Sequence, residues 1–110
     1  MSMSTVYATQ EPTRAEVEAS GEPVVLEFGA PWCGYCQAAQ PLLEAAFEGH
    51  AKVRHVKVED GKGRPLGRSF GVKLWPTLVF LDRGREVARL VRPTQAAPIR
   101  EALALIDPAM

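Results

Sequence analysis

A nearly continuous apolar run at residues 24–28 is the feature that most narrows the folds open to this chain. Such runs are typical of β-strands whose two faces are both covered by other elements. From Cys33 to Phe47, apolar residues recur every three or four positions, which predicts an amphipathic helix of about four turns. We expect a kink at Pro41, because proline removes one backbone hydrogen bond from a helix. A covered strand leading into a helix predicts an α/β fold.

Three further strands are expected after this helix. Valines at alternating positions predict a strand near residues 53–58, and a second apolar run predicts a strand at 77–81. Residues 86–91 alternate between apolar and polar types and follow a glycine-containing turn at 82–85. This pattern is typical of an antiparallel hairpin.

Two more helices and one loop complete the predicted order. Thr13 and Glu16 form a capping-box pattern that opens a short helix, and Gly21 can end it. Residues 99–106 repeat the apolar helical stripe, whereas residues 59–65 are polar and are expected to form an exposed loop. The sequence therefore predicts an α/β fold with a central mixed β-sheet flanked by helices on both faces.

Length and charge limit the class of protein. The 110 residues fit a single domain, and we expect residues 1–10 to be loosely ordered. Lys and Arg total 13 and Asp and Glu total 13, so electrostatics gives no reason to expect nucleic acid or an anionic membrane as partner. The start shows no secretory-signal pattern, and no apolar run approaches the ~20 residues of a membrane span. We expect a cytoplasmic protein, or a periplasmic one if a signal peptide has been removed.

The motif Trp32-Cys33-Gly34-Tyr35-Cys36 joins the covered strand to the helix. A thiolate is the nucleophile in disulfide exchange, and a helix N-terminus stabilises negative charge. Two intervening residues place the second sulfur one turn into the helix, where it can close a disulfide with the first. We predict that Cys33, exposed at the helix tip, forms a mixed disulfide and that the deeper Cys36 resolves it. This pattern indicates thiol–disulfide exchange.

The two cysteines could also serve as a structural disulfide or as zinc ligands. A purely structural disulfide is disfavoured, because so small a loop adds little stability. A zinc site made by Cys33, Cys36, His50 and His55 fits only loosely, since a helical stretch of roughly 20 Å separates Cys36 from His50. No metal is therefore expected. A zinc-binding interaction module and a non-catalytic one remain alternatives.

From about residue 24 to residue 106 the sequence resembles the thioredoxin family. The resemblance rests on the Cys-Gly-x-Cys core, on Phe-Gly-Val-x-x-Trp-Pro-Thr at residues 70–77 and on Pro41 within the active-site helix. It implies a thioredoxin-like fold in which Pro76 is cis, lies against the two cysteines and follows backbone that pairs with a substrate peptide. It also implies a protein-disulfide reductase with no cofactor beyond the Cys33–Cys36 disulfide. Its partners would be proteins with disulfides and an unidentified reductase or dithiol, and we expect a monomer.

Glu27 is unusual, because a carboxylate within a buried run costs free energy unless it is paired, protonated or functional. Thioredoxins usually carry an aspartate here, which implies that Glu27 accepts the proton of Cys36. The alternative is a side chain that reaches solvent.

Aligning the strands places His55 where many thioredoxins have a lysine, and we hypothesise a Glu27–His55 pair that makes proton transfer sensitive to pH. The alternative for His55 is a solvated strand histidine, and His50 is expected in the turn after the helix.

Aromatic residues gather in the two motifs and predict an apolar platform for a peptide, although the tryptophans could instead pack inside. Tyr35 replaces the proline of typical thioredoxins, and Cys-Gly-Tyr-Cys is similar to the motif of bacterial periplasmic disulfide isomerases. A disulfide isomerase or oxidant therefore remains an alternative for an exported protein.

Two further positions differ from typical thioredoxins. Gly29 stands where thioredoxins often have an aromatic residue. Arg92 stands where they have a small, glycine-containing segment, and the larger charged side chain can change the partners that fit. The predicted substrate-binding residues are Trp32, Gly34, Tyr35, Trp75, Pro76 and Arg92.

Overall fold

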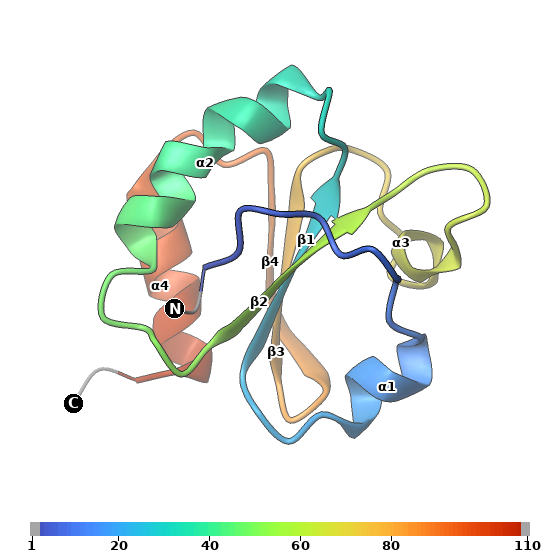
Figure 1. Ribbon diagram of the computed structural model, residues 1–110. Helices are drawn as coiled ribbons and strands as arrows, with labels where there is room; N and C mark the ends of the chain where they lie inside the picture. Colours follow the sequence, from blue (N-terminus) through green and yellow to red (C-terminus); the bar gives the residue numbers. More distant parts are fainter. Residues whose placement is uncertain (1–2, 109–110) are drawn as a thin grey trace.

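The centre of the molecule is a four-stranded mixed sheet in the order β2-β1-β3-β4, and the computed structural model describes residues 3–108 (Figure 1). β1 (Val24–Gly29) pairs in parallel with β2 (Arg54–Glu59) and antiparallel with β3 (Thr77–Asp82). β3 pairs antiparallel with β4 (Arg85–Val91), as the predicted hairpin requires. All residues of β1 are buried, so the apolar run forms an inner strand with both faces covered.

Helices cover both faces of this sheet, as predicted (Figure 1). α2 (Gly34–Ala46) and α4 (Ala96–Ile106) pack on one face and bury a core that includes Phe80. α1 (Arg14–Ala19) and α3 (Pro65–Ser69) pack on the other face. Within residues 3–108, none of these helices has the length and apolar character needed to cross a bilayer.

One of the predicted boundaries is wrong. Residues 59–65 are not a continuous loop, because Glu59 ends β2 and Pro65 begins α3, where proline at the first helical position needs no hydrogen-bonded N–H. α3 is too short to show an apolar period in the sequence. α1 ends at Ala19 with Ser20 as its C-cap, so Gly21 is the first residue beyond the cap.

Residues 1–10 are the segment for which loose order is expected. The structure describes residues 3–10 of it, and they run beside the outer edge of β2. Tyr7 forms a parallel bridge with Lys57, whose carbonyl accepts the Ala8 N–H at 2.8 Å. The Ser4 N–H donates to Nδ1 of His55, also at 2.8 Å. Residues 4–8 therefore cover backbone groups that an edge strand otherwise exposes.

Gly84 offers a test of how the β3–β4 turn packs. Arg83 and Gly84 both have positive φ, 53° and 80°, as a two-residue hairpin turn of type I′ requires. A Cβ at Gly84 would also clash with the backbone carbonyl of Glu18 at the end of α1. We predict that Gly84→Ala lowers the free energy of unfolding by about 1–3 kcal/mol, measured by urea denaturation.

Gly21→Ala is the matched control. Among the described residues, no heavy atom lies within 4 Å of the position of its Cβ, and its φ is not positive. This variant should unfold at nearly the same urea concentration as the wild type. Equal losses for the two variants would show that the turn does not pack as described.

Candidate active site

The two cysteines lie where β1 gives way to α2. Cys33 is the N-cap of α2, and its Sγ accepts the backbone N–H of Cys36 at 3.2 Å. A turn in which the Cys33 N–H donates to the carbonyl of Ala30 at 3.1 Å brings the chain to this position. Both cysteines are free thiols. Unpaired N–H groups and the helix dipole favour negative charge on a sulfur at this end of a helix.

Cys33 is more buried than predicted. Its exposed fraction is 7%, and that of Cys36 is 2%. The prediction of an exposed helix tip was wrong because Trp75 packs against a small cluster formed by Ala30 and the two cysteines. Only a small part of Cys33 is therefore accessible to a partner disulfide.

The environment of Cys36 opposes ionisation. Burial raises the pKa of its thiol from 9.0 to about 12, and the hydrogen bond with Cys33 and the charge of Glu27 act in the same direction. The backbone of Ala30 provides a smaller opposing effect. Near neutral pH Cys36 is a protonated thiol, so it needs a base before it can act as a nucleophile.

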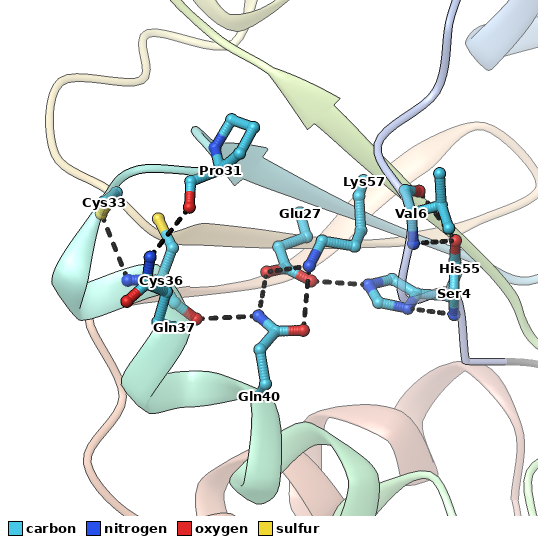
Figure 2. Close-up of polar contacts among 10 residues, drawn as sticks. All are labelled: Ser4, Val6, Glu27, Pro31, Cys33, Cys36, Gln37, Gln40, His55 and Lys57. Atoms are coloured by element: carbon cyan, nitrogen blue, oxygen red, sulfur yellow. Dashed lines mark hydrogen bonds and ion pairs between the residues drawn. The ribbon is translucent and has the colours of Figure 1, made fainter.

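Glu27 is fully buried and lies in a network of polar side chains (Figure 2). Its Oε1 lies 2.8 Å from Nε2 of His55, and its Oε2 accepts from Nε2 of Gln40 at 2.8 Å. Nζ of Lys57 lies 3.9 Å from Oε2. The hypothesised Glu27–His55 pair is therefore present, and the alternatives of a solvent-reaching glutamate and a solvated histidine are wrong.

The contacts of His55 fix the position of its proton. A backbone N–H can only donate, so the bond from Ser4 makes Nδ1 of His55 an acceptor. The proton of the neutral ring is then on Nε2, from which it is donated to the Glu27 carboxylate. A second proton on Nδ1 would break the bond to Ser4.

Lys57 and Gln40 are site residues that the sequence interpretation missed. Lys57 is the register partner of Glu27 on β2. His55 lies two positions earlier on the same face, and counting the strand register could have found both. Gln40 donates to the carbonyl of Cys36 at 2.8 Å and accepts from Nζ of Lys57 at 2.9 Å. Its spacing of four from Cys36 along a helix was the available signal.

Aromatic side chains border the thiols on the surface. Trp32 is 72% exposed and Tyr35 is 61% exposed, so neither packs inside. Trp75 is half-buried and donates from Nε1 to Asp60 at 2.8 Å. The ring centroids of Trp32 and Trp75 are 5.4 Å apart. The two motifs therefore meet in one aromatic surface, and Gly34 begins the helix behind it.

Arg92 links these two motifs. The Trp75–Pro76 peptide bond is cis, as the resemblance implied. Nε of Arg92 donates to the carbonyl of Trp75 at 2.8 Å, and its backbone N–H donates to the carbonyl of Pro76 at 2.9 Å. Its guanidinium carbon lies 4.0 Å from the centroid of the Tyr35 ring. Arg92 and Tyr35 also line a hollow of about 320 Å³, together with Ala38 and Leu42 of α2.

The loose zinc pattern does not come together in space. His50 follows α2 and pairs through Nδ1 with Asp107 at 2.9 Å, whereas His55 pairs with Glu27. Residues 3–108 contain no group of three or more His, Cys, Asp or Glu side chains placed to hold a metal ion.

Comparisons with known proteins match this geometry. The thioredoxin family model matches residues 4–104. The chain is 43% identical over 67 residues to protein disulfide-isomerase tigA of Aspergillus niger, covering 57% of this chain and 19% of that protein. It is 38% identical over 72 residues to thioredoxin of Haemophilus influenzae, covering 63% of this chain and 65% of that protein. The chain thus spans about a fifth of the isomerase and just under two thirds of the Haemophilus protein.

A solved structure matches over nearly the whole chain. Thioredoxin 2 of Pseudomonas aeruginosa PAO1 in its reduced form is 55% identical and superposes with a TM-score of 0.83. The match covers 94% of this chain and 96% of that one. This chain therefore shares its fold with a thioredoxin whose structure was solved in the reduced form.

The raised pKa of Cys36 leads to a test. In a Cys33→Ser variant, Cys36 is the only thiol, and we predict that iodoacetamide modifies it slowly even at pH 9. A free thiol with a pKa of 9.0 is half ionised there, whereas one with a pKa of about 12 is ionised to only about one part in a thousand. The measurement is the alkylation rate against pH beside a short cysteine peptide. The same protein unfolded in urea is the control, and a folded rate equal to that of the peptide would contradict the described burial.

Proposed function

Since this chain belongs to the thioredoxin family, we propose that it is a thiol–disulfide oxidoreductase that reduces disulfides in other proteins. The observation that carries the proposal is the pair of free thiols at the start of α2 with the buried Glu27 network behind them. The electrons pass through the two sulfurs, so no bound cofactor is needed. We propose that the protein acts as a single-domain monomer.

The reaction has two exchange steps. Cys33 attacks one sulfur of a substrate disulfide, forms a mixed disulfide and releases the other substrate sulfur as a thiolate. Cys36 then loses its proton, attacks Sγ of Cys33 and displaces the second substrate sulfur. The substrate gains two electrons and the protein is left with a Cys33–Cys36 disulfide. A dithiol or a reductase has to restore the two thiols.

Glu27 is the proposed base for the second step. The pKa of Cys36 is raised by burial, so the thiol needs an acceptor for its proton at neutral pH. Glu27 is the buried carboxylate whose charge acts on Cys36. Gln40 bonds both Glu27 and the carbonyl of Cys36, which holds the first turn of α2 beside the acid. Glu27 can therefore receive the proton, directly or through one water.

The substrate peptide is proposed to lie across the aromatic surface. Trp32 and Tyr35 offer exposed rings close to Cys33 in the chain. The backbone at Trp75 is the segment that pairs with an extended peptide, and Arg92 already bonds its carbonyl. A substrate therefore competes with the Arg92 side chain, which makes Arg92 a candidate for partner selection. The other proposed substrate-binding residues are Gly34 and Pro76.

A second candidate function is disulfide isomerisation. The similarity to the tigA isomerase and the tyrosine within the Cys-Gly-Tyr-Cys motif favour it. A reductase suits a reducing compartment such as the cytoplasm, and an isomerase suits an oxidising one. The reduction potential of the Cys33–Cys36 pair separates them, because a reductase needs the more negative value.

Reduction of insulin by dithiothreitol tests the principal proposal. The wild type should accelerate the reaction well above the dithiol alone, and Cys33→Ser should abolish the acceleration because it removes the first nucleophile. Cys36→Ser should accumulate a mixed disulfide with insulin, seen by mass spectrometry without reductant. A wild-type rate no faster than that of the dithiol alone would overturn the reductase proposal.

The pair formed by Glu27 and His55 gives a prediction about the second step. Nε2 of His55 lies 2.8 Å from Oε1 of Glu27, and this contact holds the carboxylate that is proposed to receive the proton. In His55→Ala, we therefore expect resolution of the mixed disulfide to slow by about tenfold, because the buried carboxylate loses a hydrogen-bond partner. The measurement is the rate of mixed-disulfide resolution at a fixed pH.

Two comparisons control this experiment. His50→Ala removes a histidine that pairs with Asp107, outside the Glu27 network, and should leave the rate unchanged. In a Glu27→Gln background, His55→Ala should slow resolution no further. A wild-type rate in His55→Ala would show that the pair has no part in proton transfer.

A further inference from the structure

Gly29, the last residue of β1, leaves open a space that two reactive groups share. A Cβ built on Gly29 would lie 2.5 Å from Sγ of Cys36 and 3.3 Å from the phenol oxygen of Tyr7. Both groups therefore face the same small space above Gly29. Cys36 is also among the groups that raise the pKa of Tyr7. The second thiol thus has a polar neighbour from the N-terminal segment.

The N-terminal segment holds the Tyr7 ring in this position. The bridge to Lys57 and the bond from the Ala8 N–H fix the backbone on both sides of the side chain. Nζ of Lys57 lies 4.7 Å from the centroid of the Tyr7 ring, within range of a cation–π contact. The ring is half-buried. Its hydroxyl is therefore placed by several contacts that do not involve Cys36.

We propose that Tyr7 is a further catalytic residue, whose O–H donates a hydrogen bond to Sγ of Cys36 and stabilises the thiolate that forms before the mixed disulfide is resolved. This inference rests on the proposed function. The Cys36 proton passes to Glu27, and Tyr7 keeps its own proton throughout. Hydrogen bonds to charged acceptors are stronger than neutral ones, so the contact strengthens as the thiolate develops.

The surroundings of Tyr7 keep it a donor. Burial is the main cause that raises its pKa above the ordinary value of 10.0, and the charges of Cys36, Glu27 and Cys33 act in the same direction. Lys57 is the cation that faces it. A phenol with a raised pKa stays protonated at every pH at which the exchange reaction runs. It therefore cannot replace Glu27 as the base and acts only by donating.

Tyr7→Phe separates donation from simple covering of the sulfur, because it keeps the ring and removes the hydroxyl. In a Cys33→Ser background, we expect Tyr7→Phe to slow the alkylation of Cys36 by iodoacetamide about tenfold at and above pH 9. Tyr7→Ala should have the opposite effect and accelerate alkylation, because it uncovers Cys36. In the otherwise wild-type protein, Tyr7→Phe should also slow resolution of the mixed disulfide and spare its formation by Cys33.

Val6→Ala is the control for changes in the same segment, since the Val6 side chain is 70% exposed. It should alkylate like the parent variant. An alkylation rate in Tyr7→Phe equal to that of the parent would overturn the proposal and leave Tyr7 only as a cover. Alkylation needs no protein substrate, so failure of the proposed function would appear in the insulin assay alone. Slower alkylation in Tyr7→Phe would still support donation to Cys36 in that case.

Discussion

The buried carboxylate of Glu27 is the constraint on which the arrangement of the site depends. A charge removed from water is tolerated only where donors and opposite charge replace its hydration. His55 and Lys57 supply these groups from β2, and Gln40 supplies one from α2. Each of them is correctly placed only if β1 and β2 keep their register and α2 keeps its rotation. The acid therefore ties the parallel strand pair to the helix that carries the cysteines.

The same helix gives its two sulfurs different environments. Cys33 is the N-cap of α2, and its Sγ accepts the backbone N–H of Cys36. Cys36 lies one turn further in, where burial raises its pKa, so its thiol needs a base, for which we propose Glu27. The proposed order of the two steps follows from these positions, since Cys36 can react only after its proton has been accepted. The exposed fractions agree with this order, because that of Cys33 is slightly larger than that of Cys36.

Patterns of short range in the sequence predicted most of the fold and the thiol pair. Apolar periodicity located the strands and the longer helices, and the spacing of Cys33 and Cys36 was sufficient to indicate exchange chemistry. These short-range patterns could not show that Trp75 packs against Cys33, because the two residues are far apart in the sequence. α3 is too short to show a period, and Lys57 required the strand register. The position of Tyr7 was not predicted, because the composition of residues 1–10 did not indicate that this segment packs against β2.

The N-terminal segment contacts both halves of the proposed proton-transfer step. Ser4 fixes the tautomer in which His55 donates to Glu27, and Tyr7, three residues later, is the proposed donor to Cys36. Residues 4–8 thus contact the neighbours of both the proposed base and the sulfur that would release the proton. Loosening this segment from β2 would remove one donor from each group at once. The reactivity of Cys36 therefore depends on how firmly the start of the chain pairs with Lys57, although no residue of that segment lies in the Cys-Gly-Tyr-Cys motif.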